Sequence, residues 1–179
     1  RDWSYHDYRD FNIEDYNLSN KELLKRGYFM VRMGSCVEKS LSNSNPRIIE
    51  YSQSKYRSDF GDVFLSYKCR FFISSDSGIS AIPETLRIPV VYVNKTFVHL
   101  IHTWTLNGIF IFKKLFLKNE NRNMTFNEVM NLSFGNIGTN EIFSQLNIDI
   151  IENTPKEILD VSIEMDERLK GTWKSSQED

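Results

Sequence analysis

The residues of this chain best suited to chemistry lie in one short polar segment, residues 74–78, which reads SSDSG. The segment follows an aromatic, apolar run and precedes a β-branched run at 90–94. This pattern predicts a turn between a buried strand and a short helix. Backbone N–H groups and hydroxyls converge on anions at such turns, so we expect the segment to bind phosphate. The expected phosphate ligands are Ser75, Asp76, Ser77 and Gly78.

Glu84 makes the expected ligand more specific. It lies six residues after Gly78, which is nearly two turns along a helix. A carboxylate offers two acceptor oxygens to the cis-diol of a ribose, and dinucleotide folds use it in this way. The turn and Glu84 together therefore indicate a nucleotide site, with Pro83 keeping the helix short or kinked. The alternative is a purely structural turn, of the kind that joins strands to helices in any α/β protein.

Arg32 is the main candidate cation, because a planar guanidinium can donate two parallel hydrogen bonds to a diphosphate. It lies with Gly34 at the end of a predicted apolar strand, where a charge without a partner is costly. Candidate acid–base residues lie near the start of the chain. His6, with Asp10 close by, could supply a general base, although a single histidine in an aromatic loop is more often structural.

Two further pairs of residues give weaker signals. His99 and His102 are spaced to share one helical face, but two histidines without a third ligand do not indicate a zinc site. Lys113 and Lys114 are expected to cap a strand or to face solvent. A role for these lysines in binding donor phosphate is the less favoured alternative.

The elements that position these residues alternate between helix and strand. Periodicity and capping residues predict a helix at 13–26, strands at 28–33 and 47–51, an amphipathic helix at 58–67 and a strand at 70–74. This alternation is typical of a parallel sheet with helices on both faces. We therefore expect an α/β, Rossmann-like fold that binds its ligand at the carboxyl ends of the strands.

Later elements are predicted mainly from their caps. Residues 109–117 fit either a strand or a buried helix. Capping boxes open two helices, Thr139 is expected to cap another, and a strand is predicted at 148–151. The residues that form the two capping boxes are Thr125 with Glu128 and Thr154 with Glu157. Helix 58–67 is expected to bury its apolar face, made of Phe60, Val63, Phe64 and Tyr67.

Composition limits the class of protein. The 179 residues suit one domain, and a composition of 40% hydrophobic and 26% charged residues is that of a globular protein. A formal net charge of −2 gives no reason to expect nucleic acid as a partner. Cys36 and Cys69 are expected to be reduced thiols, which favours the cytoplasm. The longest apolar stretch, 97–117, contains histidines and lysines and is expected to be core rather than a membrane span.

Several blocks of the chain resemble a family of bacterial glycosyltransferases of surface-carbohydrate synthesis. The resemblance runs through almost the whole chain, in family order. The blocks are DYRDFNIEDY, GYFMVRMG, YRSDFGDVFL, CRFFISSDSGISAIPETLRIPVVYVN, FKKLF and ENTPKEILDVSIEMDERLKGTW, with an RD pair at the start. The family has the GT-B architecture. The resemblance implies that residues 1–179 are the carboxyl-terminal, donor-binding domain of a two-domain enzyme, and that an amino-terminal Rossmann-like domain precedes Arg1.

The resemblance also implies roles for single residues. The SGISAIPE segment is similar to the donor site of the lipid-linked N-acetylglucosaminyltransferase of peptidoglycan synthesis. By that similarity Ser77 and Gly78 would bind diphosphate and Glu84 the ribose. Arg1 and Arg32 would stabilise the leaving diphosphate. GT-B enzymes as a rule need no metal for this step, so no metal or other cofactor is expected.

The expected function is transfer of a sugar from a nucleoside diphosphate sugar to a carbohydrate or lipid-linked acceptor. Such an enzyme would work in the cytoplasm or at the inner face of the membrane, and this chain without its amino-terminal partner domain would be inactive. Two alternatives stay open. One is a nucleotide-sugar 2-epimerase, which shares the architecture and a similar Asp-Ser-Gly turn. The other is a non-catalytic module that binds a nucleotide or a protein.

Overall fold

The computed structural model describes residues 4–35, 37, 39–41, 45–102, 104–105, 107–132 and 140–175. The predictions made for Arg1, Cys36 and Thr139 lie outside these residues. The described chain has an α/β fold that contains parallel strands and helices, as the alternation of elements predicts. None of its helices combines the length and the apolar character that a membrane crossing requires.

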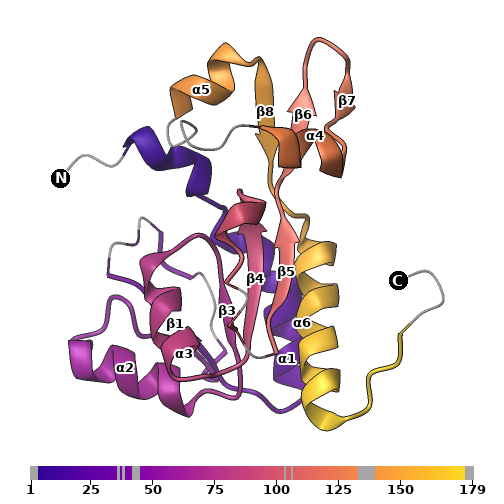
Figure 1. The fold of residues 1–179 in the computed structure, drawn as a ribbon. Helices are drawn as coiled ribbons and strands as arrows, with labels where there is room; N and C mark the ends of the chain where they lie inside the picture. The colour runs from indigo at the N-terminus through magenta and orange to yellow at the C-terminus, as the bar shows by residue number, and fades with distance from the viewer. Residues whose placement is uncertain are drawn as a thin grey trace.

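A parallel sheet of three strands lies at the centre of the fold (Figure 1). Its strands, in spatial order, are β3 (Phe72–Ser74), β4 (Val90–Lys95) and β5 (Ile109–Phe112). A separate parallel pair is formed by β1 (Met30–Arg32) and β2 (Ile48–Glu50). The expected single parallel sheet is therefore divided into two parts in the described chain.

Helices cover the central sheet. One face is packed by α1 (Asn17–Lys25) and α6 (Pro155–Lys170), which also contact each other (Figure 1). A buried apolar cluster joins β4 to α6 on this face, and its members are Tyr16, Val91, Val93, Ile158, Val161 and Met165. Tyr92 points to the opposite face, where its ring stacks on Phe110 with a centroid distance of 4.7 Å. Helices α2 (Asp59–Lys68) and α3 (Ala81–Thr85) contact each other on the β3 side of the sheet.

A third sheet is antiparallel, which the sequence analysis does not predict. Its order is β7 (Arg122–Asn123), β6 (Lys114–Leu117) and β8 (Ile148–Ile151). It packs with the amino-terminal helix η1 (Ser4–Arg9) around a cluster that includes Tyr8 and Phe143. The other elements of the described chain are η2 (Ile13–Tyr16), η3 (Gly78–Ser80), η4 (Val98–Leu100), α4 (Phe126–Asn131) and α5 (Asn140–Gln145). Residues 109–117 are thus two strands in different sheets, with Lys113 between them.

Most of the predicted helix ends are confirmed. The side chains of Asn12 and Ser58 accept hydrogen bonds from the first turns of η2 and α2. Complete capping boxes open α4 at Thr125 and α6 at Thr154. Gly171 ends α6 with a φ of 71°, a left-handed conformation that glycine adopts without strain.

The prediction for helix α2 is wrong in one respect, because its apolar face is exposed. Phe60 is 76% exposed, and Val63, Phe64 and Tyr67 are also open to solvent. The buried side carries Asp62 and Ser66 instead. A Cβ at Gly61 would lie 2.0 Å from the Tyr51 hydroxyl, and Arg57 forms an ion pair with Asp62 at 2.7 Å. These contacts keep the side of α2 that carries Gly61 and Asp62 directed toward the protein interior.

Candidate functional site

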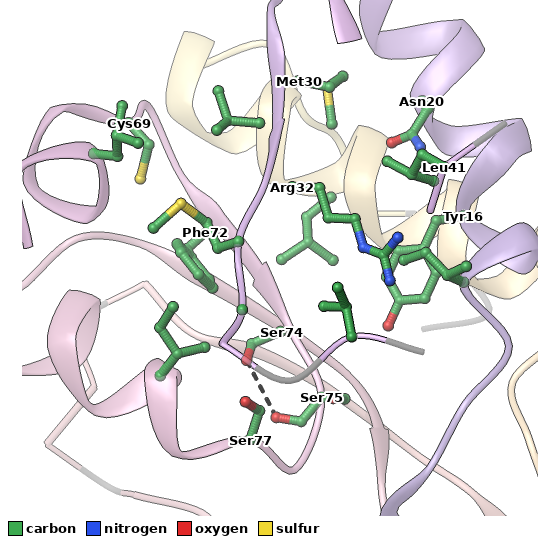
Figure 2. Close-up of a pocket in the computed structure, with 18 of the residues that line it drawn as sticks. Tyr16, Asn20, Met30, Arg32, Leu41, Cys69, Phe72, Ser74, Ser75 and Ser77 are labelled. Atoms are coloured by element: carbon green, nitrogen blue, oxygen red, sulfur yellow. Dashed lines mark hydrogen bonds between the residues drawn. The ribbon is translucent and has the colours of Figure 1, made fainter. Parts of the chain in front are cut away.

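A cavity of about 760 Å³ lies between β1 and β3 (Figure 2). In a doubly wound sheet of order 2-1-3-4-5, β1 would lie next to β3, and the crevice at that reversal of strand order is where such folds bind ligands. Here β1 pairs with β2 and β3 pairs with β4, so the cavity separates two strand edges. The cavity runs along both strands and includes residues at their carboxyl ends, where the sequence analysis expects a ligand.

One end of the cavity is polar. Figure 2 shows Ser74, Ser75 and Ser77 gathered together at the end of β3. Ser74 and Ser75 are buried, and the Ser74 hydroxyl donates to the Ser75 carbonyl at 3.2 Å. The Ser77 N–H donates to the same carbonyl at 2.8 Å. The turn is therefore tightly closed, while the side chain of Ser77 makes no capping hydrogen bond of its own.

Arg32 supplies a cation to the cavity wall from the end of β1. Its Nη1 atom donates to Glu50 at 3.1 Å and to the carbonyl of Lys39. Burial alone would raise the pKa of Glu50, but hydrogen bonds from the Leu41 N–H and from Ser52, together with the charge of Arg32, hold that pKa below its ordinary value. Glu50 is thus the ionised partner of this largely buried arginine side chain. Nε and Nη2 of Arg32 bond to no residue in the described ranges.

The other walls of the cavity are largely apolar or aromatic. Tyr16 contributes from the end of η2, Leu23 from α1, Met30 from β1 and Phe72 from β3. The sequence analysis assigns none of these residues to a site. Burial raises the pKa of Tyr16 well above its usual range, so its hydroxyl stays neutral at physiological pH.

Cys69 is a free thiol on the apolar part of the cavity wall. Its Sγ atom donates to the Ser66 carbonyl at 3.1 Å. Burial raises the pKa of this thiol to about 11. Because the thiolate is the reactive form, Cys69 is a poor nucleophile near neutral pH.

Gly34 and Asp10 also line the cavity, as the sequence analysis requires of site residues. Gly34 has a φ of 136°, which side chains rarely permit, and a Cβ there would lie 3.1 Å from Val37. The backbone conformation alone therefore explains why residue 34 is a glycine. The carbonyl of Asp10 accepts a hydrogen bond from Lys113.

Lys113 directly follows β5, which fits the expectation of a residue at a strand end, and it is buried, which excludes the expected alternative of a residue that faces solvent. Its ammonium group donates to the carbonyls of Tyr8, at 3.0 Å, and Asp10. Burial lowers its pKa because desolvation disfavours the charged form. Lys113 thus attaches the amino-terminal segment to the end of β5. Lys114, in contrast, forms a partly exposed ion pair with Glu157 at 2.7 Å.

Several predicted site residues do not line the cavity. The buried carboxylate of Asp76 pairs with Lys95 at 2.5 Å and accepts from the Thr96 N–H at 2.8 Å, so it faces the end of β4. Glu84 faces His102, at 2.5 Å. His6 lies in η1, where its ring meets Tyr8 edge to face. Gly78 follows Ser77 but does not line the wall. The structure therefore brings together Asp10, Arg32, Gly34, Ser75 and Ser77.

The expectation that His99 and His102 share a helical face is wrong. Helix η4 ends at Leu100, so only His99 is helical, and its ring lies against Phe97 at a centroid distance of 5.3 Å. His102 instead pairs with Glu84. Within the described residues, no three histidine, cysteine or acidic side chains form a group that could hold a metal ion.

Comparison of this chain with family models, with curated proteins and with solved structures found no match.

Proposed function

We propose that this chain is the donor-binding half of a GT-B glycosyltransferase that uses a nucleoside diphosphate sugar. The observation that carries the proposal is the cavity between β1 and β3, which is lined by the cation of Arg32, by serine hydroxyls at the end of β3 and by aromatic side chains. A diphosphate matches Arg32 and the hydroxyls of Ser75 and Ser77. A nucleobase matches the aromatic walls formed by Tyr16 and Phe72. The volume of about 760 Å³ is within the range of small-molecule sites.

The proposed chemistry is stabilisation of the leaving diphosphate. Negative charge develops on the diphosphate as the glycosidic bond breaks, and fixed donors that already point to that position lower the barrier. Arg32 would supply charge and Ser77 a hydroxyl. Of the two residues predicted to act as a base, Asp10 lines the cavity and His6 does not. Asp10 is therefore the base candidate within this chain, for an acceptor in surface polysaccharide or glycolipid synthesis.

Binding of nucleoside diphosphates to the chain tests the proposal. Calorimetric titration with UDP, GDP, ADP and CDP should detect one ligand, and Arg32→Gln should weaken its binding about tenfold to one hundredfold, as expected for loss of a charge-assisted hydrogen bond. Ser77→Ala should weaken it about threefold to tenfold without changing stability, because the Ser77 side chain is exposed. Arg87→Gln, at an exposed arginine outside the cavity, is the control. Absence of binding by all four diphosphates would refute the proposal.

Gly78 gives a second test, because nothing in the described chain requires glycine there. A Cβ at Gly78 would have no atom within 4 Å, and its φ is not left-handed. Gly78→Ala should therefore leave the protein as stable or raise its stability by about 0.4–1 kcal/mol. If diphosphate approaches this backbone, the methyl group should weaken binding at least about fivefold, since overpacking costs about 1–3 kcal/mol.

Gly27→Ala is the matched control for the glycine test. Gly27 also has open space around its Cα, but its φ is 95°. Alanine at 27 should lower stability through backbone strain and leave affinity unchanged. Unchanged affinity in Gly78→Ala would show that the ligand does not contact this part of the turn.

A further inference from the structure

Glu84 and His102 form a close pair outside the cavity. Glu84 lies in α3 and is 7% exposed, and its Oε2 atom lies 2.5 Å from Nδ1 of His102. The His102 side chain is 39% exposed. One edge of the imidazole is therefore held by a buried carboxylate, while the ring reaches the surface. Nε2 of His102 has no hydrogen-bond partner among the residues that the structure describes.

The plane of the imidazole is also fixed. The Trp104 ring stacks on His102, with a centroid distance of 4.6 Å and an interplanar angle of 10°. The Thr105 N–H donates to the His102 carbonyl at 3.1 Å, which closes the turn that carries both rings. Trp104 itself is 68% exposed. The histidine is thus oriented by contacts to its edge, its face and its backbone.

Two buried polar atoms at this place lack partners within the described chain. They are Oε1 of Glu84 and Oγ1 of Thr105. A buried carboxylate oxygen without a hydrogen bond is costly, and its persistence calls for an explanation. A purely structural link to His102 would be served as well by a neutral glutamine. A carboxylate adds the ability to stabilise positive charge on the imidazole.

We propose that Glu84 and His102 form a proton-accepting dyad for a hydroxyl-bearing molecule. Glu84 is the positioning residue, because its carboxylate accepts the Nδ1–H and so keeps Nε2 unprotonated. The hydroxyl of the bound molecule donates its proton to Nε2. Its O–H bond breaks, the electron pair stays on the oxygen, and the imidazolium charge forms beside Glu84. This dyad is independent of the proposed donor cavity, since neither residue lines it.

The position of the imidazole proton is the first test. Two-bond ¹H–¹⁵N correlation spectra of the wild-type chain, with His102→Gln to assign the signals, should show the neutral ring protonated at Nδ1. Glu84→Leu should shift the proton toward Nε2, because leucine offers no acceptor to Nδ1. A neutral His102 that carries its proton at Nε2 in the wild-type chain would overturn the proposal.

The chemical reactivity of His102 distinguishes a proton-accepting dyad from a structural link, because only a dyad predicts slower acylation of His102 when Glu84 loses its charge. Diethyl pyrocarbonate acylates an unprotonated imidazole nitrogen, and mass spectrometry follows each histidine separately. Glu84→Gln should slow acylation of His102 about threefold to tenfold, the equivalent of one ordinary hydrogen bond. His6 and His99 are internal references, and Thr85→Ala is the control on the same helix. Unchanged or faster acylation of His102 in Glu84→Gln would contradict the proposal and show that Glu84 only holds the loop in place.

Discussion

Replacing Asp166 with alanine will lower the free energy of unfolding by about 3 kcal/mol, near the lower end of the cost of breaking a buried ion pair. The Asp166 side chain is 0% exposed and accepts hydrogen bonds from Arg26 at 2.8 Å, Tyr28 at 2.6 Å and Lys170 at 2.9 Å. It therefore joins α6 to α1 and to the segment before β1. We expect a cost near the lower end of that range because the side chains of Arg26 and Lys170 are partly exposed and can be solvated when Asp166 is removed. Urea denaturation measures the change.

Asp160→Ala is the control for this prediction. Asp160 lies on the same helix and forms an exposed ion pair with Lys156. Its loss should change stability by no more than about 0.5 kcal/mol. A similar small change in Asp166→Ala would mean that the buried network contributes little beyond what water supplies.

The pH dependence of stability should change in the same variant. Burial alone would raise the pKa of Asp166, but hydrogen bonds from Lys170, Tyr28 and Arg26 outweigh it and hold the pKa below its ordinary value. A carboxyl whose pKa is lower in the folded state stabilises the protein above its unfolded pKa of about 3.9, and this contribution is lost as pH falls through the folded pKa. As the pH falls below about 4, the free energy of unfolding should therefore decrease less in Asp166→Ala than in the wild type.

Local structure could be predicted from the sequence wherever a few neighbouring residues determine it. The Thr154 and Glu157 capping box and the glycine at 171 define the ends of α6 because each group acts on backbone within one turn. The orientation of α2 could not be predicted in this way. Periodicity shows that Phe60 and Phe64 share a face, but not that a buried Asp62 turns that face outward.

The candidate site was predictable to the same extent. Arg32 and Ser77 both line the cavity, as expected for residues at the carboxyl ends of strands, although β1 and β3 lie in different sheets. Glu84, the expected ribose ligand, does not line the cavity, and helical spacing gives no information about which loop covers its helix. Its neighbour His102 comes from an irregular segment after η4. Such a contact depends on tertiary packing and leaves no periodic signal.

Replacing Asn153 with alanine should lower the free energy of unfolding by about 2–4 kcal/mol, because one buried and one partly buried backbone group would lose their partners at about 1–3 kcal/mol each. The Asn153 side chain accepts from the Asn94 N–H at 2.5 Å and donates to the Phe112 carbonyl at 2.8 Å. It thereby links β4 and β5 to the junction of β8 and α6. Asn127→Ala, at an exposed position in α4, is the control and should change stability by no more than about 0.5 kcal/mol.

Asn153→Asp distinguishes the two hydrogen bonds. Aspartate keeps an acceptor for the Asn94 N–H but, when ionised, directs an oxygen at the Phe112 carbonyl in place of a donor. Protonation restores a donor. The pKa of this buried carboxyl should be higher in the folded state than in the unfolded one, so the variant should be less destabilised near pH 4 than near pH 7. Equal destabilisation at both pH values would show that the Phe112 carbonyl does not depend on Asn153, and that the link to β4 carries the effect.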